Sequence, residues 1–490
     1  MNDFKNWLFP LHIILIAGGI ILPSEFIGYV ITAIIIFSTL YSLKNSLSLL
    51  FVLFPLRPFI VEINGGLAYL PDLIVLTIVL IIIFTRKYSL TYWFREYRWA
   101  ALFILLLTVG LLSGLQTGIT VPAGIFQIRS LTITLLLIVI GKEILWSRTD
   151  LNRIILVSIG TALVISVHGL IEKLSLRNWL LPASWKDWNL AAANEMRIYG
   201  LIANPNVLAT YLIIVFFSTY LLKNTWLNSR LLVILRIVLA GTALLTYSRG
   251  AILAFTLGAV VYIILRRTWK HALTLLFYAF VSFSLIYYPV VLAAEGIEES
   301  GYFDQFAEEK NNTADELKEK SPDPVVKENN VLIERFKEMF SNDTIQASAE
   351  WGRIYVVLKG IEIFSDHPMF GSGFSTYGDA AAQTYESPLY EEYGIPNHLY
   401  TDNQYISLLV STGVTGVVLA SSLLFLLASK LLRVDHTLWR SISLSALVIL
   451  LTSALFYNIL EDKTFTLYFY FMIGYVLNNK INLENCYEMD

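Results

Sequence analysis

Long apolar runs recur along the whole chain and constrain its fold more than any other feature. The hydrocarbon core of a bilayer is roughly 30 Å thick, and about 20 residues of helix are needed to cross it. Hydrophobic residues make up 56% of the 490-residue chain and charged residues only 15%, whereas a soluble domain has roughly 25% charged residues. We therefore predict an all-α polytopic membrane protein. Its predicted spans, about 14 in number, cover residues 7–22, 26–43, 47–62, 69–85, 98–115, 124–141, 153–171, 204–222, 230–247, 250–265, 272–292, 404–428, 438–460 and 464–478.

Basic residues in the short loops predict how these spans are oriented. Lysine and arginine gather at 86–98, 142–153, 223–230, 266–270 and 430–433. Short loops rich in these residues stay in the cytoplasm, so we expect both termini to be cytoplasmic and the other loops to lie outside the plasma membrane. The N-terminus has no small-residue cleavage site, and we expect it to be retained as the first span rather than removed as a signal peptide.

One long polar segment interrupts the pattern of spans. We predict a transmembrane bundle over 1–292, an extracellular loop over 293–403, and three last spans with a short cytoplasmic tail over 404–490. Residues 293–350 carry 15 of the 38 acidic residues, which favours a flexible flap. A turn-rich segment, DHPMFGSGFSTYG, starts at residue 366. Between the two, an amphipathic helix is predicted from apolar side chains at helical spacing, namely Trp351, Ile354, Tyr355, Leu358, Ile361 and Phe364.

Four arginines fall on the predicted outer side: Arg129 in the sixth span, Arg197 before the eighth, Arg249 between the ninth and tenth, and Arg353 in the loop helix. A guanidinium group keeps its charge when partly desolvated and binds phosphate oxygens through paired hydrogen bonds. Cations at the edges of spans usually face a polar cavity or a partner. The four arginines therefore indicate an anionic ligand at the outer surface. The alternative is that each reaches lipid headgroups or pairs with a loop acid.

Composition and missing motifs exclude other functions. The net charge of −3 argues against a nucleic-acid partner. The single cysteine, Cys486, excludes an intrachain disulfide. The sequence has no Asp-x-Asp pair and no HExxH motif, which are common metal-binding patterns. We therefore expect neither a metal ion nor another cofactor.

Four stretches carry a resemblance to known enzymes. They are RIYGLIANPN from 197, YSRGAIL from 247, GRIYVVLKGIEIFSDHPMFGSGFSTY from 352 and TDNQYISLLVSTGVTG from 401. In this order around one long outer loop, they resemble the O-antigen ligase and O-antigen polymerase family over roughly residues 190–420. The resemblance implies a membrane glycosyltransferase fold of the C type. It also implies transfer of a glycan from a polyprenyl diphosphate to a sugar hydroxyl outside the cytoplasmic membrane, without nucleotide sugar or metal.

The resemblance assigns binding of the donor diphosphate to Arg249 and Arg353, and less directly to Arg197. Arg129 is added because it is predicted on the same side. Negative charge develops on the departing oxygen during such a transfer, and fixed cations stabilise it where it develops. Further substrate contacts are predicted at Tyr247, Asn206, Asn403 and Tyr400.

The acceptor hydroxyl needs a general base within hydrogen-bond reach. The ligases have a histidine and an asparagine about ten residues before a glycine pair. Here Gly413 and Gly416 put Asp402 and Asn403 at those positions, and His398 stands four residues earlier. The base is therefore Asp402 or His398, and the departure from the ligase pattern favours a polymerase. Alternatively, residues 401–404 form a capping box in which Asp402 only caps the next helix.

Other polar and aromatic residues on the outer side leave their roles open. Glu461 and Asp462 line an acceptor groove or are solvated turn charges. Five loop tyrosines suit either sugar faces or an interfacial belt: Tyr377, Tyr385, Tyr390, Tyr393 and Tyr400.

Two functions of different classes fit these features. The first is a polymerase, or a related ligase, whose partners are a polyprenyl-diphosphate-linked glycan donor, a second lipid-linked repeat unit and the membrane lipid, with a chain-length regulator left open. The second is a lipid-linked oligosaccharide flippase, which must expose its site to both sides and usually has related halves. The chain shows no evident halves and has about 110 outer-loop residues with ordered motifs, which favours the enzyme.

Overall fold

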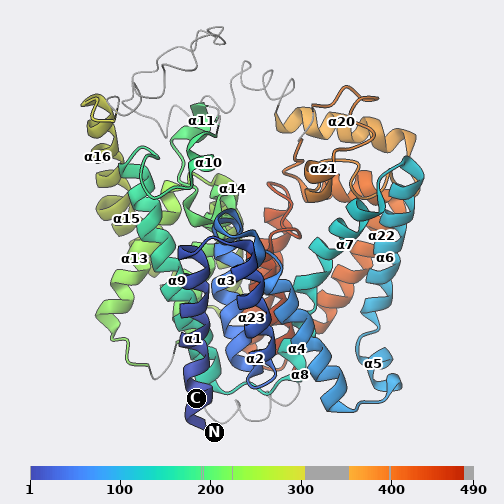
Figure 1. Cartoon of the computed structure of the whole chain (residues 1–490), viewed down its shortest axis with the longest axis horizontal. Helices are drawn as coiled ribbons and strands as arrows, with labels where there is room; N and C mark the ends of the chain where they lie inside the picture. The colour runs from blue at the N-terminus through green and yellow to red at the C-terminus, as the bar shows by residue number, and fades with distance from the viewer. Residues whose placement is uncertain are drawn as a thin grey trace. The chain divides into compact units, whose positions relative to one another are not determined.

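A computed structural model describes residues 2–188, 190, 192–222, 225–303, 352–396 and 399–478. Within these ranges the regular elements are all helices (Figure 1). The chain divides into two compact units. Unit 1 comprises residues 1–104, 128–294 and 420–490, and unit 2 comprises residues 105–127 and 295–419.

The helices follow one another along the chain with short connections. In order they are α1 (Asn2–Ile21), α2 (Glu25–Thr39), α3 (Leu43–Ile63), η1 (Gly65–Leu67), α4 (Leu70–Arg86), α5 (Leu90–Glu96), α6 (Trp99–Thr117), α7 (Val121–Leu135), α8 (Leu137–Glu143), α9 (Arg148–Leu174), α10 (Ala183–Lys186), α11 (Ala192–Glu195), η2 (Gly200–Ile202), α12 (Pro205–Ser218), η3 (Thr219–Leu221), α13 (Ser229–Leu245), α14 (Arg249–Arg266), α15 (Lys270–Ser282), the π-helical turn η4 (Phe283–Tyr287), α16 (Tyr288–Glu299), α20 (Arg353–Asp366), α21 (Ala380–Tyr385), α22 (Gln404–Leu432), α23 (Thr437–Ser453) and α24 (Lys463–Val476).

Eight of the described helical stretches are long and apolar enough to cross a membrane, and four shorter apolar helices accompany them. The predicted all-α architecture is therefore confirmed for the described residues, and the apolar helices fit a multi-pass membrane protein. The third predicted span is one of the eight, although Pro55 and Pro58 lie inside it. The predicted number of about 14 spans is not confirmed.

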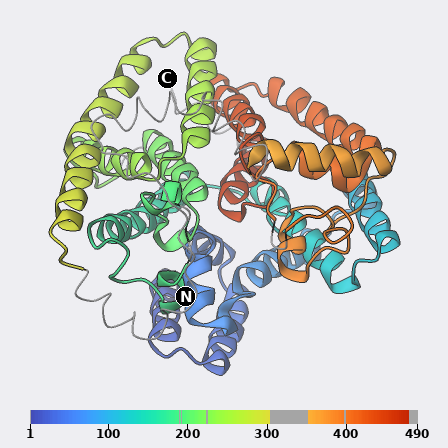
Figure 2. The same ribbon diagram turned by 90° about the horizontal axis from the view of Figure 1, so that it is seen from above.

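Side chains at the helix starts and small residues at the crossings explain how unit 1 is built. Ser147 and Asp150 form a capping box at the start of α9, which satisfies backbone N–H groups that have no partner within the helix. Gly141 of α8 lies against Gly474 of α24, where a Cβ on either would fall within 3.0 Å of the facing backbone. Small residues at such contacts let helix backbones approach closely. α13 packs against α9, α12 and α15, and these green helices lie side by side in both views (Figure 1 and Figure 2).

Polar contacts join helix ends of unit 1 near its short basic loops. Lys44 pairs with Asp150 at 2.5 Å, and Arg86 donates to the carbonyl of Glu143 at 2.5 Å. Arg266 bonds the Thr437 hydroxyl at 2.8 Å at another inner loop. These are the loops that the basic residues predict to be cytoplasmic. Arg129, Arg197 and Arg249, which were predicted on the other side, are described below.

Unit 2 is built around a break in α22. Gly413 has φ 61° and ψ −164°, a conformation that is essentially restricted to glycine. The backbone of 368–373 fills the break: Ser372 N–H donates to the Val410 carbonyl at 2.8 Å, and Val414 N–H to the Pro368 carbonyl at 2.9 Å. The turn-rich segment therefore serves to pair the backbone groups that the broken helix leaves open. The predicted span 404–428 was expected to be continuous, and its glycine is the reason that it is not.

The loop helix of unit 2 forms as predicted, but the face it buries is different. α20 buries Val356, Gly360 and Ile363, whereas the predicted apolar face at Ile354, Leu358 and Ile361 is exposed. The buried side chains pack in the core of unit 2 with Tyr377, Tyr390 and Val410. The apolar spacing predicted the helix correctly but not the face, because both faces of this short helix carry apolar residues. The acidic flap predicted over 293–350 is wrong at its start, because α16 continues to Glu299. Residues 304–350 of that flap, Trp351, His398 and Cys486 lie outside the described residues.

Candidate functional site

The turn between α13 and α14, residues 246–248, presents Arg249. Tyr247 has φ 52°. A residue other than glycine adopts such a backbone angle only when its surroundings hold it there. The hydroxyl of Ser248 donates to Asn206 Oδ1 at 2.9 Å. The Tyr247 ring packs edge-on against Tyr287 with centroids 5.7 Å apart. This α13–α14 turn is therefore fixed in shape by groups from α12 and η4.

Arg197 is the main brace of the α13–α14 turn. Its Nε donates to the Thr246 carbonyl at 2.9 Å, and one terminal nitrogen donates to Asn206 Oδ1 at 2.8 Å. The other terminal nitrogen reaches Asn194 Oδ1 at 3.3 Å. All three nitrogens are thus directed at protein acceptors. The structure brings the predicted residues Arg197, Asn206 and Tyr247 together, and it gives Arg197 a positioning geometry.

Arg249 is the first residue of α14 and is exposed. The first backbone N–H groups of a helix have no partner within the helix and favour an anion, and an arginine at this position adds a full charge. The glycine that follows is explained by packing: a Cβ on Gly250 would lie 2.6 Å from the ring of Phe456. The short SRG motif therefore combines a close helix contact with a cation at a helix N-terminus.

An ion pair that the sequence did not reveal fixes the segment directly after Arg197. Glu172 pairs with Arg177, and it accepts backbone N–H bonds from Tyr199 at 3.0 Å and Gly200 at 2.6 Å. The guanidinium of Arg177 lies over the rings of Tyr199 and Trp188 at 4.8 and 5.4 Å. The RIYG stretch thus owes its conformation to a buried carboxylate at the end of α9.

Arg129 lies in a second group of charges, which we call the Asp72 cluster: Asp72, Arg57, Arg129, Lys463 and the ring of Tyr69. Asp72 Oδ2 accepts Arg129 Nε at 2.6 Å and pairs with its terminal nitrogen at 2.5 Å. Lys463 Nζ stands 3.4 Å from Asp72 Oδ1. The Tyr69 ring covers Arg129 at 4.8 Å. Asp72, Arg57 and Lys463 were not predicted, although each is a charge near the end of an apolar run.

Contacts of Tyr457 with Thr210 and Asp462 lie next to members of both groups. Thr210 follows Asn206 by one turn of α12, and its hydroxyl is 3.2 Å from that of Tyr457. Tyr457 also interacts with the carboxylate of Asp462, the residue before Lys463. Asp462 is buried and caps α24 by accepting from Thr464 N–H at 2.8 Å. Burial raises the pKa of Asp462 to about 7, so it is not the solvated turn charge that was one of the alternatives.

The remaining predicted residues belong to unit 2. Arg353 is the first residue of α20 and is exposed. Asn403 caps α22, since its Oδ1 accepts from Tyr405 and Ile406 N–H at 3.1 Å each. Asp402 precedes that cap with φ 45° and is half-buried. The cap seen here is therefore made by Asn403, the role of Asp402 stays a prediction, and His398 lies outside the described residues.

The loop tyrosines divide into two kinds. Tyr377 and Tyr390 are almost completely buried, and the Tyr377 hydroxyl donates to the Val356 carbonyl at 2.5 Å. These two belong to the core of unit 2 and are not surfaces for sugar. Tyr385 is exposed and packs against Phe126 with ring centroids 5.7 Å apart, and Tyr400 is half-buried. Tyr393 is half-buried, and its hydroxyl donates to Asp366 Oδ2 at 2.7 Å. A sugar contact stays a prediction for Tyr385, Tyr393 and Tyr400.

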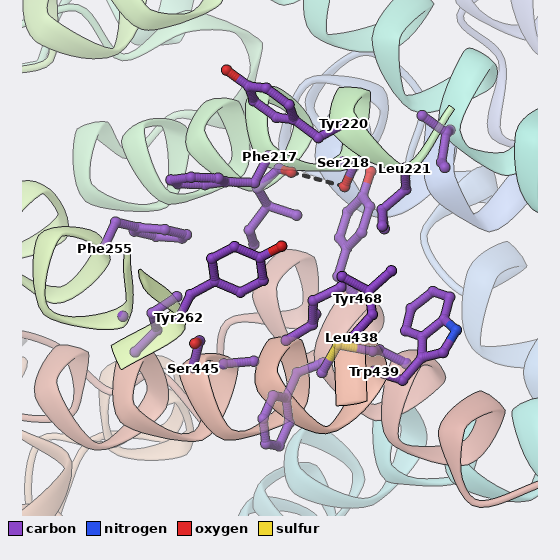
Figure 3. Close-up of a pocket in the computed structure, with 18 of the residues that line it drawn as sticks. Phe217, Ser218, Tyr220, Leu221, Phe255, Tyr262, Leu438, Trp439, Ser445 and Tyr468 are labelled. Carbon is purple, nitrogen blue, oxygen red and sulfur yellow. Dashed lines mark hydrogen bonds between the residues drawn. The ribbon is translucent and has the colours of Figure 1, made fainter. Parts of the chain in front are cut away.

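Unit 1 also encloses an apolar cavity of about 320 Å³ between α9, α12, α14, α15, α23 and α24. Figure 3 shows its lining, with Phe217, Phe255 and Tyr262 on one side and Leu438, Trp439 and Tyr468 on the other. Arg148 and His271 belong to the lining, so it extends toward the loops predicted to be cytoplasmic. None of the predicted catalytic or diphosphate-binding residues lines it. In the described part of the chain, no three His, Cys, Asp or Glu side chains gather in a way that could hold a metal.

Residues 233–421 match the family model described as O-antigen ligase. The predicted resemblance is confirmed over these residues, which include the α13–α14 turn, α20 and the first half of α22. Arg249, Arg353 and Asp402 lie inside the match, whereas Arg129, Arg197 and Asn206 lie outside it. The match supports glycan transfer of the O-antigen ligase or polymerase type. No curated protein matches the chain.

Proposed function

We propose that the protein is a polysaccharide polymerase that moves a polyprenyl-diphosphate-linked glycan onto a sugar hydroxyl of a second lipid-linked repeat unit at the outer face of the membrane. The observation that carries the proposal is Arg249, an exposed cation at a helix N-terminus inside the matched region. A permanent, planar cation there suits a diphosphate. The braced α13–α14 turn keeps that cation in place.

The reaction needs one bond to form and one to break. The oxygen of the acceptor hydroxyl bonds to the anomeric carbon of the donor sugar while the bond from that carbon to the phosphate oxygen breaks. Arg249 and Arg353 stabilise the charge that develops on the departing diphosphate. The hydroxyl proton passes to a base, for which Asp402 is the described candidate and His398 the alternative. Arg197 acts through the turn that it braces rather than on the substrate.

A polymerase is favoured over a ligase by the residues before Gly413. A ligase-type histidine would stand where this chain has Asp402, a half-buried carboxylate directly before the cap residue Asn403. We assign transfer of the acceptor proton to this carboxylate, with His398 as the alternative. The enzyme function is expected to require neither metal nor nucleotide sugar, in keeping with the resemblance.

Reconstitution tests the proposal directly. The purified chain in lipid nanodiscs is given one kind of lipid-linked repeat unit together with an acceptor glycan that carries no lipid diphosphate, and the products are separated by length. A ladder of lipid-linked oligomers is expected, with one lipid diphosphate released per bond. Transfer only to an acceptor without a lipid diphosphate would show a ligase. Movement of the repeat unit between bilayer leaflets without lengthening would show a flippase.

A further inference from the structure

Positive charge exceeds negative charge in the Asp72 cluster. The charges that act most strongly on Lys463 are one carboxylate, Asp72, and two guanidinium groups, Arg57 and Arg129. Three cations thus face one anion, which leaves an excess of two positive charges. The side chain of Asp72 is only 5% exposed and that of Lys463 15%.

Such an excess is costly where water is scarce. A buried charge is stable when a partner of opposite charge and hydrogen bonds compensate it. A purely structural ion network would be expected to balance its charges. Here two further negative charges would complete the balance, and the diphosphate of a lipid-linked sugar carries about two at neutral pH because both phosphates are esterified.

The contacts of the cluster leave two cations able to turn to such a ligand. The distance from Lys463 Nζ to Asp72 Oδ1 is 3.4 Å, whereas a strong charge-assisted hydrogen bond measures about 2.7 to 2.9 Å. The Arg57 guanidinium reaches the Ala68 carbonyl at 3.4 Å. Both groups are held loosely, while Arg129 is held firmly by Asp72. The ring of Tyr69, 55% exposed, covers Arg129 and gives the cluster an accessible edge.

The segment that carries Tyr69 is preorganised. Asn64 donates to the Gly19 carbonyl at 2.8 Å and to the Ser24 carbonyl at 3.1 Å, and its Oδ1 accepts from Gly66 N–H at 3.0 Å. Gly66 lies so close to the backbone of Glu25 that a Cβ would fall 2.2 Å from the Glu25 carbonyl oxygen. A rigid support of this kind reduces the ordering cost of binding.

We propose that Arg57, Arg129 and Lys463 form a second diphosphate site, separate from the α13–α14 turn. Resting on the proposed function, the inference assigns one diphosphate to each site: the donor's to Arg249 and the acceptor's to the Asp72 cluster. Thr210, Tyr457 and Asp462 stand between the two sites. A polymerase joins two lipid-linked substrates and therefore has to hold two diphosphates, whereas a ligase has to hold one.

The inference is tested by measuring how much radiolabelled undecaprenyl diphosphate binds to the full chain in phosphatidylcholine nanodiscs. Undecaprenol, which has no diphosphate, measures the background binding of the lipid tail. The wild type is expected to bind two molecules per chain. Lys463→Gln and Arg57→Gln should each keep one site and weaken the other by about 10- to 100-fold, the effect of losing one charge-assisted hydrogen bond. Arg249→Lys should keep the site at the Asp72 cluster. Lys44→Gln is the matched control, since it removes another lysine paired with an aspartate, and it should bind two.

Several results would overturn the inference. One molecule bound per wild-type chain would do so, as would unchanged binding in both Lys463→Gln and Arg57→Gln. Tyr69→Ala, at an exposed position, should also weaken binding at the second site. It replaces Lys463→Gln and Arg57→Gln as the test if those variants do not fold. Displacement of the second molecule by phosphatidylglycerol in the nanodisc, or equal binding of inorganic pyrophosphate, would show a general anion site instead. A chain that binds two molecules but lengthens no glycan would contradict the proposed function alone, and one that polymerises with a single site would contradict only this inference.

Discussion

Replacing Arg197 with lysine should loosen the α13–α14 turn before it affects anything else. The guanidinium makes three hydrogen bonds, at 2.9, 2.8 and 3.3 Å, and a lysine at this position can keep one of them. Hydrogen bonds to charged groups contribute about 1.5 to 3 kcal/mol each. Arg197 is half-buried, so the lower end applies, and the loss of two bonds should cost about 3 kcal/mol.

Hydrogen–deuterium exchange of the purified chain measures this loss locally. A cost of about 3 kcal/mol corresponds to opening of the turn about 100-fold more often, and the effect should be confined to peptides that cover Ile198 and residues 246–250. Binding of polyprenyl diphosphate should weaken by less than this factor, because Arg249 remains. Arg236→Lys is the control. Arg236 is engaged with Thr219 at 2.7 Å and Tyr278 at 3.3 Å, so its replacement should increase exchange near η3 and leave diphosphate binding unchanged.

Unchanged exchange around residue 248 together with lost diphosphate binding would refute this reasoning. That result would make Arg197 a direct ligand of the diphosphate instead of a brace. Asn206→Ala separates the two roles further, because it removes an acceptor shared by Arg197 and Ser248 and takes no cation away.

The remaining predictions concern the broken helix, the base and a buried acid. Gly413→Ala should cost about 1 to 3 kcal/mol in backbone strain, seen as a lower midpoint of thermal unfolding, whereas Gly160→Ala, inside α9 with nothing within 4 Å of the added Cβ, should not lower it. Asp402→Asn should lower turnover without changing the melting temperature, whereas Asn403→Ala should destabilise the chain by about 1 kcal/mol through loss of the cap. If Asp402→Asn retains turnover and His398→Ala abolishes it, His398 is the base. Burial raises the pKa of Asp462 to about 7, above about 3.9 in the unfolded chain. Stability should therefore fall as the pH rises from about 4 to 7, and a fall of equal size in Asp462→Asn would contradict that.

The sequence was sufficient to predict the helical architecture because apolar length is a local property. Runs such as 47–62 and 250–265 became α3 and α14 within a few residues. The arginine of the SRG motif could be predicted as exposed for a similar reason, since it stands between two apolar runs. The break at Gly413 could not, because it depends on a backbone segment about 40 residues earlier that fills it.

The Asp72 cluster was missed because its members come from α3, α4, α7 and α24. No spacing within one segment reveals a contact between Asp72 and Lys463, which are separated by 391 residues. The start of α22 shows the opposite case. A local capping pattern was visible in the sequence, but the left-handed φ of Asp402 and the cap formed by Asn403 were not. Long-range contacts and single backbone angles thus decided what periodicity could not.

The central claim is that Arg249 holds the diphosphate of the donor. Its most direct test is the rate of glycan lengthening by purified Arg249→Lys in nanodiscs supplied with one kind of lipid-linked repeat unit. Arg230→Lys is its control, an exposed arginine next to the start of α13. A lysine keeps the charge but lacks the planar, paired donors of arginine, so Arg249→Lys should produce almost no oligomer while Arg230→Lys matches the wild type. Oligomers of wild-type length and rate from Arg249→Lys would show that this arginine does not hold the diphosphate.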